Sequence, residues 1–125
     1  ASQHATGALD HALQSFERSA LLHRELGDQA RQASALRGVA AVHRGGLRID
    51  EALSAAREAI DLLQLVADRW QLAHCLDELA EALSAAGHRS EAAESWRRAL
   101  PLLDAFADHR AARLRARITT CLAQP

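Results

Sequence analysis

The five residues "VADRW" at 66–70 have counterparts of the same shape in "LGDQA" at 26–30 and "FADHR" at 106–110. The three stretches begin at positions 26, 66 and 106, so they recur at a constant interval, and a helical pattern follows each of them. A fixed long period is typical of stacked supersecondary units, each of which is too small to bury its own apolar face. The sequence therefore predicts a repeat architecture.

The acidic residue in each stretch predicts where a helix begins. Asp28, Asp68 and Asp108 each follow a small residue, Gly or Ala. A short carboxylate in this place accepts hydrogen bonds from the free N–H groups of the first helical turn and complements the helix dipole. After Asp28 and Asp68, mainly apolar residues recur at i, i+3, i+4 and i+7, which indicates one face of a helix, whereas after Asp108 the stripe begins about two residues earlier.

A second helix is expected in each unit. Segments containing glycine at 44–50 and 86–90 should end the first helices, because glycine readily supplies the left-handed residue of a helix end. Asp50 and Ser90 are then expected to cap the second helices. Pro101 lies inside the last of these helices, where it removes a backbone hydrogen bond, so we expect a kink or an early end near this position.

Composition agrees with helices, because Ala and Leu supply most of the apolar residues while the β-branched residues that favour strands are scarce. We expect an all-α fold, an antiparallel helix-pair solenoid of about 2.5 repeats with five to six helices. It should form a single domain over 1–125. Its expected parts are the second helix of a partial repeat, two full repeats and a terminal capping helix, at 10–26, 27–66, 67–106 and 107–125.

The columns of small residues at this period resemble those of the tetratricopeptide repeat family, in a variant whose unit is longer than the usual one. These columns hold Ala40 and Ala80 in the first helices, and Ala12, Ala52, Ala92, Ser19, Ala59 and Ala99 in the second helices. An aromatic residue is usual between the last two columns, and Phe16 and Trp96 stand there, with Ala56 as the exception. The resemblance implies that Trp96 is largely buried between helices.

Arrays with this spacing resemble the helical tails of large bacterial transcriptional regulators and signalling ATPases. The resemblance implies a module for protein–protein interaction or regulation, a scaffold within a longer chain. The alternative is a sensor domain that binds a peptide or small molecule in the concave groove. The family forms that groove from its first helices, and its exposed positions map onto Ser34, Arg37, Arg44, His74, Asp77, Glu81, Ser84 and Arg117.

Catalysis and metal binding are not predicted. The seven histidines form no HxxxH pattern and no Cys/His pair with ligand spacing, so we expect no metal and no cofactor. Asp77 and Glu81 share a helical face at i, i+4, but no nucleophile, glycine-rich phosphate loop or GxSxG motif accompanies them. These acids, with Glu78, are most simply interpreted as a solvated face, and the chain is not expected to be an enzyme.

Basic residues gather at the end of the chain, where residues 107–125 hold four Arg and one Asp. On a helix Arg110, Arg113 and Arg117 cluster, whereas Arg115 points away, and no aromatic residue interleaves with them. Nucleic-acid binding by this segment is therefore not expected. The net charge of −1 likewise gives no field that would attract nucleic acid or an anionic membrane.

The two cysteines, Cys75 and Cys121, are far apart in the sequence and make neither a disulfide framework nor a CxxC motif, which favours a reducing cytoplasm. The sequence contains neither an apolar run long enough to span a membrane nor a signal peptide. We expect a soluble cytoplasmic protein.

The first helical copy has no first-type helix before it, because residues 1–8 are too few for one. An apolar face of this copy should therefore be partly exposed, and such faces usually mark an interface. The sequence predicts that the chain self-associates through this face or joins it to a preceding repeat of a parent protein. The residues of the face are Leu9, Leu13, Phe16 and Ala20.

Overall fold

In a computed structural model the backbone is described for residues 2–124 and the side chains for residues 7–124. This part of the chain is entirely helical apart from its turns, without strands, so the expected all-α class is confirmed. Its six helices are α1 (Ser2–Glu25), α2 (Gln29–Gly45), α3 (Ile49–Leu62), α4 (Arg69–Ala85), α5 (Arg89–Leu103) and α6 (His109–Ala123).

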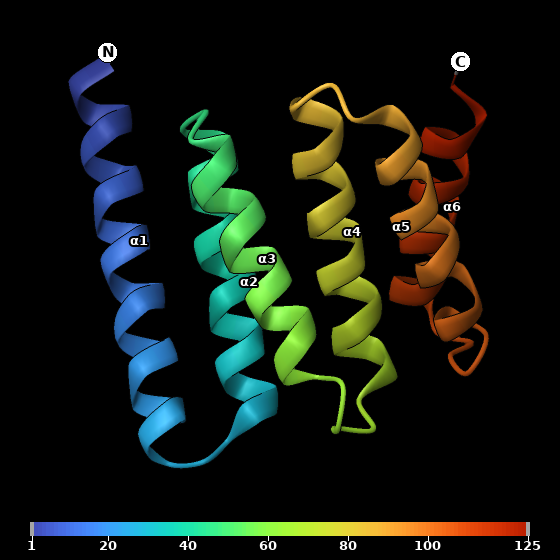
Figure 1. The fold of residues 1–125 in the computed structure, drawn as a ribbon, viewed down its shortest axis with the longest axis horizontal. Helices are drawn as coiled ribbons and strands as arrows, with labels where there is room; N and C mark the ends of the chain where they lie inside the picture. The colour runs from blue at the N-terminus through green and yellow to red at the C-terminus, as the bar shows by residue number, and fades with distance from the viewer. Residues whose placement is uncertain (1, 125) are drawn as a thin grey trace.

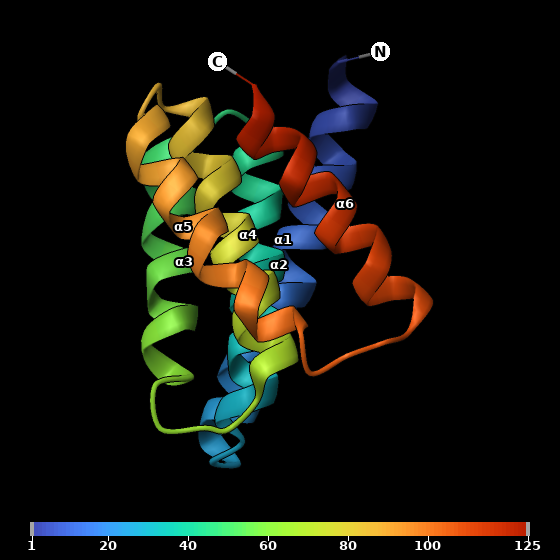
Figure 2. The ribbon, with the colours of Figure 1, turned by 90° about the vertical axis from the view of Figure 1, so that its right-hand side faces the viewer.

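Consecutive helices run in opposite directions and pack side by side (Figure 1). The most extensive packing joins α2 to α3 and α4 to α5, while α4 also contacts α2 and α3. Figure 2 shows α3 and α5 on one side of the molecule and α6 on the other, with α2 and α4 between them. Helix α6 crosses this end of the molecule obliquely. One face of the molecule is thus formed by α2, α4 and α6, and this face contains the candidate site.

Five of the helices begin at a constant interval in the sequence, which is half the interval between the three Asp caps. The residues that precede them are Asp28, Arg48, Asp68, His88 and Asp108. The three predicted Asp caps are confirmed. Their side chains accept hydrogen bonds from the backbone N–H groups of Arg31, Gln71 and Ala111, at 3.1, 3.0 and 2.9 Å.

The predicted caps of the second helices are wrong. Helices α3 and α5 begin before Asp50 and Ser90, which lie in their first turns, and neither preceding residue makes a side-chain cap hydrogen bond. In α3 the extension includes Ile49, which packs against the hydrophobic core. In α3, burial of Ile49 therefore outweighs the local preference for a polar cap, whereas the first residue of α5, Arg89, is exposed. Asp50 still complements the positive end of the helix dipole from the first turn.

Three of the five turns between helices α1 to α6 contain a left-handed residue, but glycine does not always supply it. Gly87 has a φ of +83°, as expected for the segment at 86–90, and Gly27 has a φ of +73°. In the turn at 46–48, however, the left-handed residue is Leu47, with φ of 62°, although Gly45 and Gly46 are adjacent. Leu47 is 82% exposed, so no packing offsets the strain of this conformation.

Leu47 and Gly87 lie one repeat period apart, and substitutions at these two positions should have opposite effects on stability. Gly87→Ala is expected to lower the free energy of unfolding by about 1 kcal/mol, because alanine disfavours positive φ. Leu47→Gly should be neutral or slightly stabilising, since relief of strain offsets the entropy that glycine adds to the unfolded chain. Urea unfolding of both variants measures the difference, and a larger loss for Leu47→Gly than for Gly87→Ala would contradict it.

Two expected helix ends are also corrected. Helix α5 continues past Pro101 to Leu103, whose side chain is fully buried, so the helix does not end near Leu100. Packing of Leu103 offsets the hydrogen bond that proline cannot make. Helix α1 begins at Ser2 rather than Asp10, so the residues upstream extend the same helix instead of remaining outside it.

The core consists mainly of alanine and leucine at the helix contacts. The predicted small-residue positions of α2 to α5 are fully or almost fully buried, which allows the backbones to approach closely; they are Ala40, Ala52, Ala59, Ala80, Ala92 and Ala99. Trp96, only 6% exposed, lies between these residues in the largest buried cluster. The expected burial of this side chain is confirmed.

Candidate functional site

An ion pair ties α2 to α4. The guanidinium of Arg44 donates from Nε to Glu78 Oε2 at 2.6 Å and from Nη2 to Oε1 at 3.3 Å. Glu78 is 8% exposed. The hydrogen bond to Glu78 raises the pKa of Arg44. A forked pair of this kind fixes the direction of both side chains, so it sets how the two helices face each other.

A second network joins α4, α5 and α6 at Asp77, which is 7% exposed. One carboxylate oxygen accepts a hydrogen bond from Trp96 Nε1 at 3.0 Å, and the other accepts one from Arg117 Nη2. Arg117 also donates from Nη1 to Glu81 Oε1 at 2.8 Å. Asp77 and Arg117 occupy the same position in successive repeat units, so stacking of the units brings them together.

The interpretation of Asp77, Glu78 and Glu81 as a solvated acidic face is therefore wrong for the first two residues. Their sequence spacing is that of an exposed helical face, but Arg44 and Arg117 from neighbouring helices cover them. Buried carboxylates are retained when their oxygens have such partners. Both acids serve to hold helices together, and their oxygens are already occupied by hydrogen-bond donors.

Beside this network lies an open cleft of about 490 Å³ between α2, α4 and α6. Side chains from all three helices line it: Arg37, Trp70, His74, Arg110, Arg113, Leu114 and Arg117. Three of the predicted groove residues, Arg37, His74 and Arg117, are thus brought together. Among the lining side chains described here none is acidic and four are arginines, so the cleft is a concentrated positive surface on a chain of net charge −1.

Sequence reasoning missed the aromatic part of this cleft. Arg110 lies over the ring of Trp70, with Cζ 5.1 Å from the ring centroid. The rings of His74 and Phe106 meet Trp70 edge-on, with centroids 4.6 and 5.3 Å away. Trp70 and Arg110 are separated by one repeat period, so the repeat itself could have indicated the contact between them. An aromatic residue does accompany the basic cluster, but it comes from another helix.

The free charges of the cleft belong to two arginines. Arg113 has no ion-pair or hydrogen-bond partner within residues 7–124, and the buried Nε of Arg37 lacks a hydrogen-bond partner there. Burial, followed by the nearby charge of Arg37, lowers the pKa of His74. His74 is thus neutral at pH 7, and the positive charge of the site comes from the arginines.

Other predicted positions lie outside the cleft. Ser34 is half-buried on α2, and Ser84 is exposed beside a smaller cavity of about 160 Å³, between α4, α5 and α6. Arg115 points away from the basic cluster, as predicted, and pairs with Asp104 at 2.7 Å. Arg44 faces Glu78 instead of the cleft.

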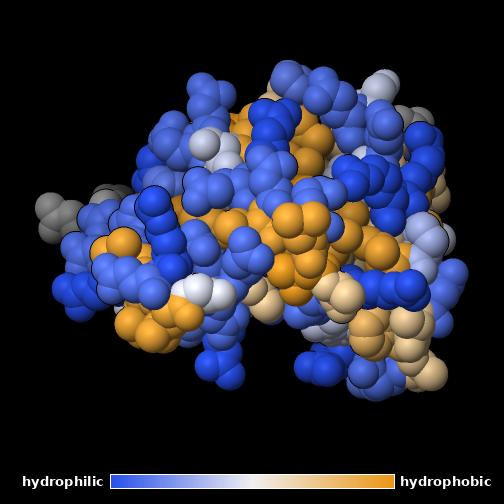
Figure 3. Space-filling model, turned by 60° about the horizontal axis from the view of Figure 1, so that its bottom comes forward, coloured by the Kyte–Doolittle hydropathy of each residue, from blue (hydrophilic) through white to orange (hydrophobic). Residues whose placement is uncertain are grey.

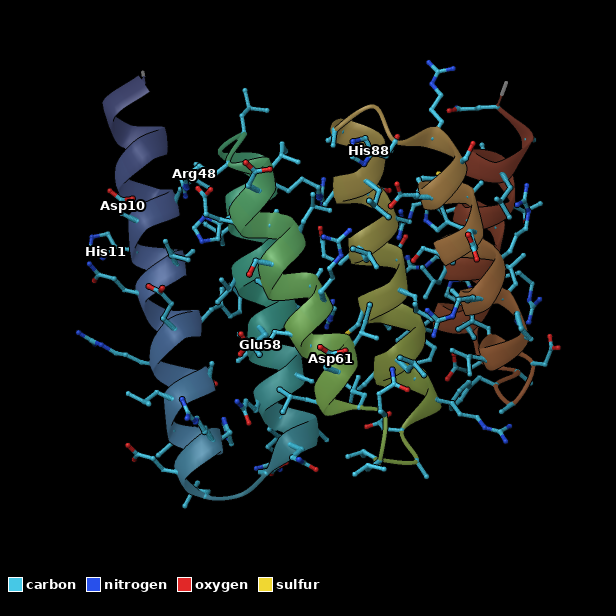
Figure 4. All side chains as sticks on the ribbon, in the orientation of Figure 1. Asp10, His11, Arg48, Glu58, Asp61 and His88 are labelled. Carbon is cyan, nitrogen blue, oxygen red and sulfur yellow. The ribbon has the colours of Figure 1, made fainter. Side chains whose placement is uncertain are left out.

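The expected association face on α1 is only partly packed against α2, and Phe16 in it is 38% exposed. Leu9, Leu13 and Ala20 are half-buried, and the ring of Phe16 lies so close to Gly38 of α2 that a Cβ there would be 2.4 Å from it. His11, labelled in Figure 4, points away from α2 on the outer side of α1. The strongly exposed leucines lie elsewhere in the chain: Leu21, Leu22, Leu26, Leu47 and Leu65. Figure 3 shows that apolar side chains form patches on the face that it brings forward.

Three further features of the described part of the chain concern metal binding, the buried thiol of Cys75 and membrane crossing. No group of three or more His, Cys, Asp or Glu residues there could hold a metal ion. Burial raises the pKa of Cys75 to about 12, so its thiol stays protonated at neutral pH. None of the helices α1 to α6 combines the length and hydrophobicity that crossing a membrane requires.

Compared with known proteins, the chain matches no model of a protein family, and neither the curated proteins nor the solved structures contain a match.

Proposed function

We propose that the chain is a tetratricopeptide-type helix-pair solenoid that binds a protein partner through the cleft between α2, α4 and α6. In this proposal it is a regulatory scaffold in the cytoplasm and part of a larger bacterial transcriptional regulator or signalling protein. The repeat type is supported by the constant interval between the starts of helices α2 to α6 and by the buried small-residue columns.

The observation that carries the binding function is the contrast between the cleft and the surface beside it. Next to the cleft, Arg44, Asp77, Glu78 and Glu81 satisfy one another or neighbouring helices through ion pairs and hydrogen bonds. On two residues that line the cleft, the buried Nε of Arg37 and the guanidinium of Arg113 have no such partners within residues 7–124. Polar groups in a concave site that the fold itself leaves unsatisfied favour binding of an external ligand.

The alternative is a sensor that binds a peptide or small molecule in the same cleft. Its volume of about 490 Å³ falls within the range usual for ligand sites, about 300–1,000 Å³. A second copy of the chain is a further proposed partner, through Leu9, Leu13, Phe16 and Ala20. For that partner, Phe16→Glu should reduce any concentration-dependent increase in light scattering.

Selection from a random peptide library tests the interaction module. Recovered peptides should raise the melting temperature of the wild-type chain, because a ligand of the folded state stabilises it by mass action. The same peptides should raise the melting temperature of the Arg113→Glu variant much less. A metabolite screen in the same assay tests the sensor alternative. Failure to recover any peptide that depends on the cleft would overturn the proposed function.

A further inference from the structure

We infer that the cleft between α2, α4 and α6 recognises an acidic peptide segment, with carboxylate side chains on Arg37 and Arg113 and an apolar side chain against Trp70. This inference rests on the proposed function and names the chemistry of the partner. It concerns carboxylate side chains within a segment and does not require a free peptide terminus.

The sign of the ligand follows from the charges that remain after the internal pairs are made. Arg117 is held between Asp77 and Glu81, and Nη2 of Arg110 lies 3.8 Å from the carboxylate of Asp108. Arg37 and Arg113 come from different helices, α2 and α6, and retain donors for a ligand. Arginine forks match carboxylate oxygens in pairs, so the two residues suit two acidic groups.

The apolar part of the ligand follows from Trp70 and Leu114, which line the cleft among the arginines. Contacts with Phe106 and His74 hold the indole edge-on, so the ring offers a fixed surface. The cleft, at about 490 Å³, exceeds what a single anion would fill and is open to solvent. A segment that alternates acidic and apolar side chains uses both features.

A nucleic acid fits this surface less well. Phosphates occur at every nucleotide, so a strand would have to continue from the cleft across the adjacent part of α4. On that part of the helix the three acids Asp77, Glu78 and Glu81 are paired with only two arginines, Arg44 and Arg117, so no positive charge is left there for further phosphates. The chain as a whole carries a net charge of −1. A continuous polyanion would be repelled there, whereas a short acidic segment ends within the basic region.

The test uses a fluorescein-labelled peptide, acetylated and amidated, of sequence Glu-Glu-Leu-Glu-Glu-Leu, and its analogue with Gln in place of Glu. Fluorescence anisotropy should show the acidic peptide binding at least about tenfold more tightly than the analogue, and less tightly as salt is added. Arg113→Glu should weaken binding by about tenfold or more. Arg97→Glu is the matched control, since it makes the same charge change on the exposed side of α5.

Three outcomes would overturn the inference. The two peptides could bind equally, Arg97→Glu could weaken binding as much as Arg113→Glu, or a thymidine oligonucleotide could displace the acidic peptide and bind more tightly. Failure of the proposed function is distinguishable from these results. If the library yields neutral peptides that bind the cleft, the interaction module stands and only the acidic chemistry is wrong.

Discussion

Replacing Trp96 with alanine should lower the free energy of unfolding by about 3–5 kcal/mol, the usual range for truncating a large buried aromatic side chain. The side chain is 6% exposed and lies in the cluster that joins α2 to α6. Its neighbours on α5, Ala92 and Ala99, are small and cannot expand to fill the space that alanine would leave. Urea unfolding of the two proteins measures the loss.

A matched control is the other tryptophan. Trp70 is only half-buried, so Trp70→Ala should cost clearly less than Trp96→Ala. Trp96→Phe separates volume from hydrogen bonding, because phenylalanine keeps much of the apolar contact and removes the N–H that Asp77 accepts. A loss below about 1 kcal/mol for Trp96→Ala would mean that the packing around α5 is wrong.

Local signals in the sequence predicted the helices better than the contacts between them. The caps at Asp28, Asp68 and Asp108 depend only on the first turn of each helix, and all three are present. Asp50 does not cap α3, because the helix begins one residue earlier, at Ile49, which packs against the core. A rule based on local sequence cannot include this tertiary contact.

The sequence predicted several residues that line the candidate site, but it did not predict which side chains contact one another between helices. The resemblance to tetratricopeptide repeats placed Arg37, His74 and Arg117 on the concave face of the first helices, and these three do meet at the cleft. Whether an acid on such a face is solvated depends on which side chain the next helix places over it. That is why Asp77 looked exposed in the sequence and yet is buried. The contact of Trp70 with Arg110 likewise crosses between helices and is invisible to spacing within one helix.

Asp77→Ala is expected to have the next largest effect, a loss of about 2–3 kcal/mol in the free energy of unfolding. Removal of the carboxylate leaves the buried N–H of Trp96 without its acceptor, and it removes one of the two acids that hold Arg117. Arg117 keeps Glu81 and is partly exposed, so water compensates much of its loss. Most of the destabilisation should therefore arise at Trp96.

Asp61→Ala provides the control, because Asp61 lies exposed on α3 (Figure 4) and should change stability by less than about 0.5 kcal/mol. A double-mutant cycle locates the interaction. In the Trp96→Phe background, Asp77→Ala should cost about 1.5–2 kcal/mol less than in the wild-type chain, since the N–H is already absent. Equal costs in both backgrounds would show that the hydrogen bond to Trp96 does not account for the effect. Asp77 would then act mainly through Arg117, and the attachment of α6 to α4, which forms one wall of the cleft, would depend on that ion pair.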